Sequence, residues 1–131
     1  MNFNGEAMIY LLDTNTCIYL LKHHSPSVTK RFAECHDEVA ISSISWAELC
    51  CGLNLQTANS LLNELKEQVS VLPFDDKVAQ IYAELTQKFP RQRDYFNRLI
   101  AAHAIALDAV LVSNTVEDFK MYNLSVENWV D

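Results

Sequence analysis

The feature that most constrains the fold is the run Met8–Leu12, whose apolar and strand-forming residues lead directly into Asp13. A run without polar interruption is typical of a strand that is buried on both faces of a parallel sheet. Thr14 and Asn15 come next, and residues of these types often begin helices. Ligands of open α/β sheets bind beyond the carboxyl ends of the strands. The pattern therefore predicts that Asp13 lies in a functional site.

Strands and helices are predicted to alternate along the rest of the chain. Apolar periodicity indicates helices between short β-rich stretches, and these stretches predict strands at 39–42, 69–74, 109–113 and 124–127. Such alternation, with only two glycines and three prolines, is typical of a three-layer α/β domain. We expect a single domain over residues 8–131, with a mostly parallel sheet of four to five strands flanked by helices. Residues 1–7 are polar and predict a flexible N-terminal extension.

One predicted helix, Tyr95–Leu107 with Asp94 as its cap, is apolar on nearly every side in its later part. A helix of this kind is expected to be buried. His103, within the apolar part, is interpreted as a core histidine. Asn97 falls in the first turn, where the helix dipole favours a carboxylate, so a neutral amide there is unexpected.

The formal charge of −7 argues against a protein that binds nucleic acid by net attraction alone. The four cysteines form no C-x-x-C pair and two are adjacent, which indicates buried thiols in a reducing cytoplasm. The sequence has no signal peptide, and no apolar run approaches the ~20 residues of a membrane span. We therefore expect a cytoplasmic protein that does not enter the membrane.

The predicted topology brings four polar residues to the carboxyl edge of the sheet: Asp13, Glu48, Asn97 and Asp118. Taken singly, each acid could be a helix cap or a surface charge. Ser45 and Glu48, for example, have the S-x-x-E spacing of a capping box. The shared position beside strand ends is what indicates a site.

Acids gathered in a cleft require compensation. Two carboxylates about 5 Å apart repel by roughly 3 kcal/mol at an effective dielectric constant of about 20. The sequence supplies no basic residue beside them, so cations are the expected partners. Oxygen ligands suit hard divalent ions, here Mg²⁺ or Mn²⁺. Such ions can activate water for the hydrolysis of a phosphodiester.

The same residues carry a family resemblance. Residues 11–15 (LLDTN), 41–49 (ISSISWAEL) with Gly52, 97–104 (NRLIAAHA) and 111–119 (LVSNTVEDF) resemble PIN domains. The likeness is greatest to the VapC-type toxins of bacterial toxin–antitoxin pairs, and it extends from Met8 to Trp129. The resemblance implies a PIN-like fold and a metal-dependent endoribonuclease that cleaves RNA when free. It also implies a VapB-type antitoxin, whose C-terminal segment occupies the groove of the toxin, and a homodimer.

The resemblance places the first, second and fourth acids of the family on Asp13, Glu48 and Asp118. Asn15 and Ser113 match polar positions that support the site. The third acid falls on Asn97, where the family pattern has aspartate, and an amide is a weaker ligand for a hard cation. We therefore expect low or no activity from this chain.

Two explanations of Asn97 stay open. It was introduced in place of a native aspartate so that a toxic nuclease could be produced in a host, or the protein is a naturally weakened member. Two other function classes also remain. One is a catalytically dead PIN-like binding module, and the other is a receiver-like domain phosphorylated on Asp13. The absence of a lysine just after the fourth or fifth predicted strand weighs against the second class.

Arg91, Arg93 and Arg98, with Lys88, form the one basic cluster near the predicted site. Arginines at such a place are interpreted as contacts to RNA phosphates. A solvated loop that balances charge explains the cluster equally well.

Overall fold

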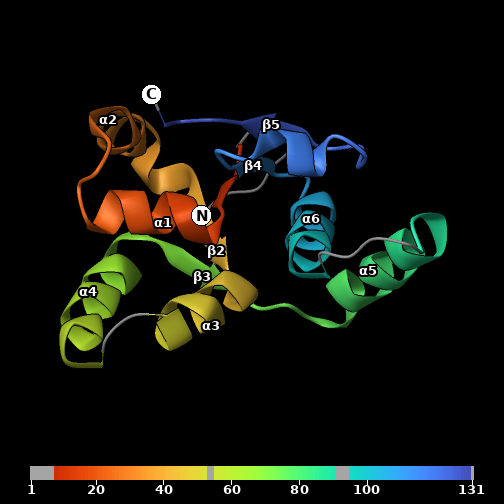
Figure 1. Cartoon of the computed structure of the whole chain (residues 1–131), viewed down its shortest axis with the longest axis horizontal. Coiled ribbons are helices and arrows are strands. Elements are labelled where there is room, and N and C mark those ends of the chain that lie inside the picture. The colour runs from red at the N-terminus through yellow and green to blue at the C-terminus, as the bar shows by residue number, and fades with distance from the viewer. Residues whose placement is uncertain (1–7, 53–54, 91–94, 131) are drawn as a thin grey trace.

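The computed structural model describes residues 8–52, 55–90 and 95–130. These residues form three layers, with a parallel sheet between two groups of helices (Figure 1). The predicted extension at 1–7 and the predicted cap Asp94 lie outside the described residues. Within these ranges, no helix combines the length and the apolar character that a membrane crossing needs.

The sheet has five parallel strands in the order β3-β2-β1-β4-β5. This confirms the predicted α/β class and the predicted sheet. β1, which leads into Asp13, is the central strand, and its residues pair with both β2 and β4. The strands are β1 (Tyr10–Leu12), β2 (Val39–Ser42), β3 (Ser70–Leu72), β4 (Val110–Val112) and β5 (Ser125–Glu127).

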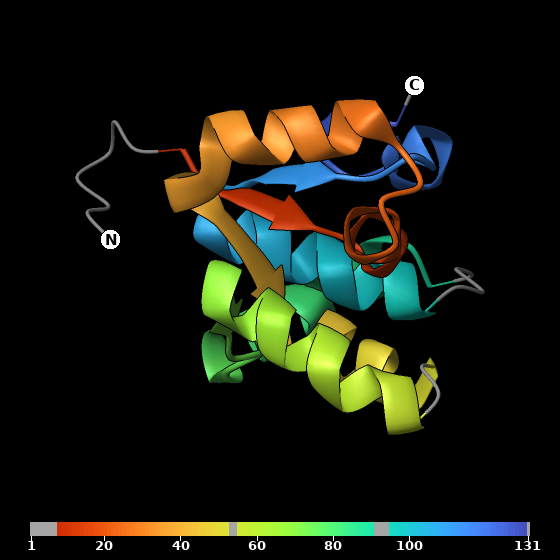
Figure 2. The same ribbon diagram turned by 90° about the vertical axis from the view of Figure 1, so that its left-hand side faces the viewer.

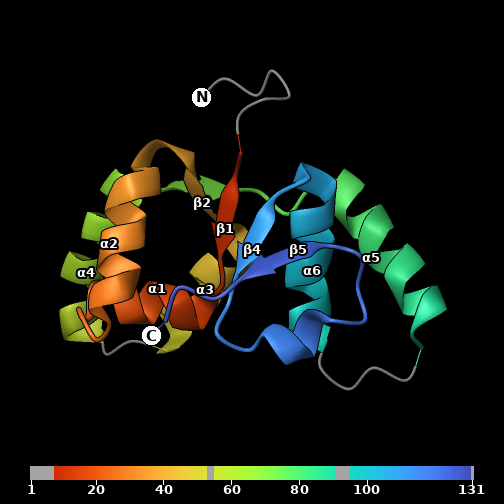
Figure 3. The same cartoon turned by 90° about the horizontal axis from the view of Figure 1, so that it is seen from above.

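The described residues form six helices, five of which are divided between the two faces of the sheet. α1, α2 and α4 lie on one side and α5 and α6 on the other (Figure 3), and Figure 2 views the sheet from the side of α2 and α4. Short 3-10 turns, η1 (His36–Glu38) and η2 (Val116–Phe119), complete the connections. The helices are α1 (Thr14–Leu21), α2 (Pro26–Cys35), α3 (Ser43–Gly52), α4 (Leu55–Gln68), α5 (Asp76–Lys88) and α6 (Tyr95–Leu107).

The core consists of two clusters, one on each face of the sheet. Successive side chains of a strand point to opposite faces. Leu12 and Ile41 therefore pack under α1, α2 and α4, whereas Leu11 and Leu111 pack under α5 and α6. All four side chains are fully buried. This double burial explains why β1 and β4, in the middle of the sheet, are uninterrupted apolar runs.

The start of α3 differs from the predicted capping box. The helix begins at Ser43, and the Ile44 N–H donates to Ser42 Oγ at 3.1 Å. Ser45 therefore lies inside the helix, where its buried hydroxyl has no hydrogen-bond partner among the described groups. The capping-box interpretation of Glu48 is wrong, because the helix starts before Ser45.

The cysteines divide into two pairs, all of them free thiols. Cys17 and Cys35 are buried, as predicted, on α1 and α2. Cys50 and Cys51 are exposed on α3, so the prediction of buried thiols is wrong for them. They lie in the last turn of α3, on faces of the helix that the core does not cover.

His103 is a core histidine, as predicted, and is 1% exposed. Its Nδ1 lies 2.7 Å from Ser42 Oγ, and its ring forms a T-shaped contact with the ring of Phe74. Burial lowers the pKa of His103, and the nearby carboxylate of Asp75 opposes this effect. The histidine therefore ties α6 to the end of β2 in its neutral form.

Candidate active site

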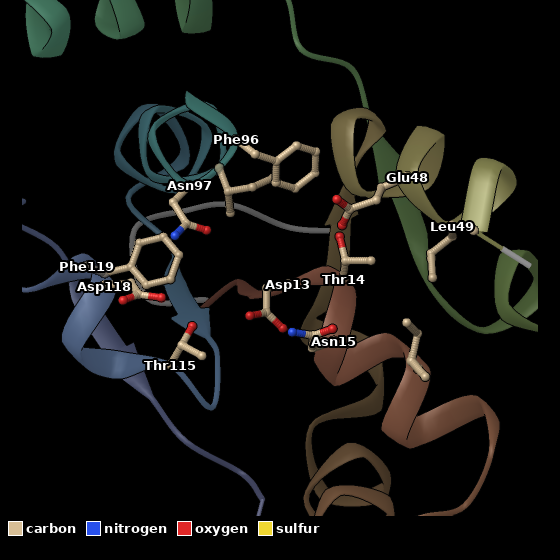
Figure 4. Close-up of a pocket in the computed structure, with 13 residues that line it drawn as sticks. Asp13, Thr14, Asn15, Glu48, Leu49, Phe96, Asn97, Thr115, Asp118 and Phe119 are labelled. Atoms are coloured by element: carbon tan, nitrogen blue, oxygen red, sulfur yellow. The ribbon is translucent and has the colours of Figure 1, made fainter. Parts of the chain in front are cut away.

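A pocket of about 440 Å³ opens beyond the carboxyl end of β1 (Figure 4). All four residues that the sequence predicts for the site line this pocket, and Asn15 lines it with them. They come from the end of β1, from α3, from the first turn of α6 and from η2. The structure therefore brings together Asp13, Glu48, Asn97 and Asp118, although the first and the last are 105 positions apart in the sequence.

Asp13 is held in place by the fold on both sides. Its backbone N–H donates to the Val112 carbonyl at 3.0 Å, which continues the pairing of β1 with β4. Its Oδ1 accepts a hydrogen bond of 2.8 Å from the Thr16 N–H and so caps α1. The predicted caps, Thr14 and Asn15, lie inside the helix instead. Asp13 is 9% exposed and keeps its second carboxylate oxygen for the pocket.

Cys17, one turn along α1, shows the effect of this carboxylate. Burial raises the pKa of the Cys17 thiol far above its ordinary value, and the negative charge of Asp13 raises it further. The thiol therefore stays protonated at neutral pH and is no nucleophile. Chemistry in this pocket belongs to its oxygen-bearing side chains.

Glu48 and Asp118 approach the pocket from opposite walls (Figure 4). Both side chains are exposed, in contrast to Asp13. Glu48 is carried by α3, and Asp118 by the short turn η2. Asn97 faces the pocket from the start of α6, on the same side as Asp118 (Figure 4).

Ser113 acts on the pocket through a neighbour. It is fully buried and does not line the pocket. Its hydroxyl accepts a hydrogen bond of 3.0 Å from the Thr115 N–H, and the two hydroxyls are also 3.0 Å apart. Thr115 itself lines the pocket. Sequence reasoning did not identify Thr115, although the spacing Ser-x-Thr directly after a buried strand is a signal for such a turn.

Thr14 and Phe96 also line the pocket and were not identified from the sequence. Thr14 is 8% exposed. Phe96, with Ile100 and Leu49, provides an apolar part of the wall. Their types occur throughout the core, so no sequence signal separates them from ordinary packing residues.

The electrostatics of the pocket favour a cation. Its lining residues include three acids and, within the described part of the chain, no lysine, arginine or histidine. The metal ligands that this lining offers are oxygen atoms, which is the donor set of Mg²⁺ and Mn²⁺. They belong to the carboxylates of Asp13, Glu48 and Asp118 and to the amides of Asn15 and Asn97. In the arrangement seen, no group of three Asp, Glu, His or Cys side chains among the described residues could hold an ion. The exposed acids Glu48 and Asp118 would have to turn inward to bind one.

Arg98 corrects the prediction of a basic RNA contact. Its side chain is fully buried. The guanidinium donates to Thr86 Oγ1 at 2.9 Å and to the Phe89 carbonyl, so it joins α6 to the end of α5. A buried side chain cannot reach RNA phosphates. Arg91 and Arg93 lie outside the described residues.

Comparison with known proteins supports the arrangement. The family model described as "PIN domain" matches residues 10–121. The chain is 34% identical to Ribonuclease VapC2 of Rickettsia felis, over 93% of this chain and 98% of that protein. It is 30% identical to the tRNA(fMet)-specific endonuclease VapC of Salmonella typhimurium, over 92% of this chain and 97% of that protein.

Solved structures show the same fold. The crystal structure of VapBC2 from Rickettsia felis, bound to a DNA fragment from its promoter, contains a chain that matches with a TM-score of 0.81. That chain is 31% identical, and the match covers 93% of this chain and 99% of that one. The sequence, the parallel sheet and the acid-lined pocket agree on one assignment, and the chain belongs to the PIN domain family, in its VapC group.

Proposed function

We propose that this protein is a metal-dependent endoribonuclease toxin that hydrolyses RNA phosphodiesters and is neutralised by a VapB-type antitoxin. One observation carries the proposal: three acids and Asn97, from four separate elements, line one pocket at the end of the central strand. The relatives named ribonuclease and endonuclease support this activity.

Asp13, Glu48 and Asp118 would hold one or two Mg²⁺ or Mn²⁺ ions. The ions would supply positive charge to the reacting phosphate and activate water as the nucleophile. One carboxylate oxygen of Asp13 accepts a hydrogen bond from the Thr16 N–H. This bond would hold the other carboxylate oxygen of Asp13 in a constant direction. Asn15 would orient the ligands or the scissile phosphate from the first turn of α1. No side chain has to form a covalent intermediate.

The hydroxyl of Ser113 would contribute indirectly, because it fixes the backbone of Thr115 at the pocket. The apolar side chains of Phe96 and Ile100 in the pocket wall would limit water on one side of the acids. Fewer water molecules there strengthen the interaction between the acids and a cation.

Asn97 leaves the proposed site one carboxylate short. An amide oxygen binds a hard cation less strongly than a carboxylate, because it lacks the full negative charge. We propose that this chain is a weakened form of the enzyme and that an aspartate at this position would restore it. Sequencing the native gene separates the two origins, since an Asn codon would exclude an introduced change.

Partners follow from the solved relatives. The similar chains from Rickettsia felis, Salmonella typhimurium and Haemophilus influenzae all come from solved structures of VapBC. We propose that a VapB-type antitoxin binds this chain at the groove of the acid pocket, and that the toxin is a homodimer. A purified antitoxin should therefore compete with RNA for the pocket.

The decisive experiment compares RNA cleavage by this chain and by Asn97→Asp, with Mn²⁺ or Mg²⁺ and with EDTA. We expect the Asp variant to cleave at least about 100-fold faster, because an added ligand charge stabilises a bound divalent ion by several kcal/mol. EDTA should abolish cleavage.

Asn123→Asp is the matched control, because it adds the same charge at an exposed position that does not line the acid pocket. It should leave the rate unchanged. If neither this chain nor Asn97→Asp cleaves a broad panel of RNAs, the nuclease proposal fails. Intact antitoxin binding by both would then assign the chain as a catalytically dead binding module, which is the alternative that Asn97 favours.

A further inference from the structure

The hydroxyl of Thr14 makes no hydrogen bond that would stabilise the fold, among the groups that the structure describes. Thr14 is 8% exposed, and its Oγ1 is shielded from solvent without a hydrogen-bond partner among the described groups. Buried hydroxyls nearly always have a partner, because an unpaired one loses its hydrogen bonds to water. A buried hydroxyl in the wall of a functional pocket therefore indicates a partner that this side chain meets in use.

Thr16, two residues later on the same helix, provides the contrast. Its hydroxyl donates to the Val112 carbonyl at 3.3 Å and is satisfied within the fold. The capping of α1 is performed by Asp13, so the helix start does not need the hydroxyl of Thr14. Helix formation therefore explains neither the identity of Thr14 nor its orientation.

Glu48 carries an acceptor on the side to which the Thr14 side chain points (Figure 4). The side chains of Thr14 and Glu48 point toward one another across the pocket wall (Figure 4), and both line the pocket. Their helices, α1 and α3, pack against each other. Glu48 is exposed and forms no salt bridge with any described lysine or arginine, so its carboxylate is able to turn.

We propose that Thr14 is a positioning residue, whose hydroxyl donates a hydrogen bond to the carboxylate of Glu48 and orients it toward the acid pocket. A carboxylate has about four lone-pair positions, so it can accept from Thr14 and still bind a cation. The hydroxyl proton stays on Thr14, and no bond is made or broken. Exposed Glu48 thereby gains the fixed direction that Asp13 obtains from Thr16.

This proposal rests on the proposed metal-dependent function, and metal affinity is its direct test. Donors behind a metal ligand typically contribute 10- to 100-fold to metal affinity.

Mn²⁺ is titrated by calorimetry into Asn97→Asp and into the same protein with Thr14→Val, Thr14→Ser or Thr16→Val. Thr14→Val should weaken Mn²⁺ binding by about 10- to 100-fold, and Thr14→Ser should retain it. Thr16→Val, which removes a hydroxyl used inside the fold, should lower the melting temperature without weakening Mn²⁺ binding. Unchanged Mn²⁺ affinity in Thr14→Val would overturn the proposal.

A second measurement needs no metal and separates this proposal from the nuclease proposal. Thermal unfolding of the metal-free chain is compared for Thr14→Val, Glu48→Met and the double variant, since glutamine in place of Glu48 would still accept the hydrogen bond. The hydrogen bond predicts that the two shifts in melting temperature are not additive, because each single variant already breaks it. If Asn97→Asp binds no Mn²⁺, the metal-dependent function fails while the cycle still decides the Thr14–Glu48 pair. Additive shifts would overturn the pair. Higher KM for RNA in Thr14→Val, with Mn²⁺ affinity intact, would instead assign the hydroxyl to the substrate.

Discussion

Replacing Arg98 with Ala should destabilise the domain strongly and leave RNA recognition unaffected. The guanidinium is fully buried and donates to Thr86 and to the Phe89 carbonyl. Hydrogen bonds from a charged donor contribute about 1.5–3 kcal/mol each. Two costs of the buried arginine offset part of this contribution, and the substitution relieves both. The charge is desolvated, and the buried Nε has no partner among the described groups. We therefore expect a net loss of about 3 kcal/mol, the lower end of the sum for the two hydrogen bonds.

Urea denaturation followed by circular dichroism measures this loss. With a slope of about 2 kcal/mol per molar urea, the midpoint should fall by roughly 1.5 M. Lys88→Ala is the matched control, since it removes an exposed cation from the same helix as Thr86. It should change the unfolding free energy by less than about 0.5 kcal/mol.

Two results would refute this reasoning. A loss below about 0.5 kcal/mol in Arg98→Ala would mean that the buried guanidinium does not join α5 to α6. A flatter salt dependence of RNA binding in a still-folded Arg98→Ala would mean that the side chain contacts phosphate after all.

Asp13 and His103 give two further predictions. Asp13→Ala should lower the unfolding free energy by about 1 kcal/mol relative to Asp13→Asn, because Asn still caps α1. Thermal melts measure the difference, and equal stability of the two variants would contradict the capping role. His103 has a lowered pKa in the fold, so the unfolded chain binds the proton more readily. Stability should fall as the pH drops below about 6.5, and His103→Asn should flatten that fall. Urea midpoints at about pH 7.5 and about pH 5.5 test this, and parallel pH dependences would contradict it.

The fold was largely readable because its inner strands, β1, β2 and β4, are buried among the helices of both faces. β1 and β4 are apolar runs, and β2 and β5 were predicted close to their observed bounds. Asp13 was identified by topology, since a parallel sheet places the ends of its strands at one edge.

The sequence did not assign a role to residues whose type suits several roles. Arg98 follows basic residues in the sequence, and only the packing of α6 on α5 shows that its charge is buried. Ser45 and Glu48 match a capping box by spacing, but Ser42 holds the start of α3. Thr14 and Thr115 became visible through the pocket that they line.

The fold holds the three acids of the pocket in place to different degrees. Asp13 continues the central strand and is hydrogen-bonded on both sides, so exchange of its amide proton should require opening of the sheet itself. Glu48 and Asp118 project from the rim, as exposed side chains on a helix and a 3-10 turn. The fold alone therefore fixes one carboxylate of the pocket, and it leaves the other two to be oriented by further contacts. A cleft built in this way adapts to ligands of different shapes through its rim, without disturbing the core.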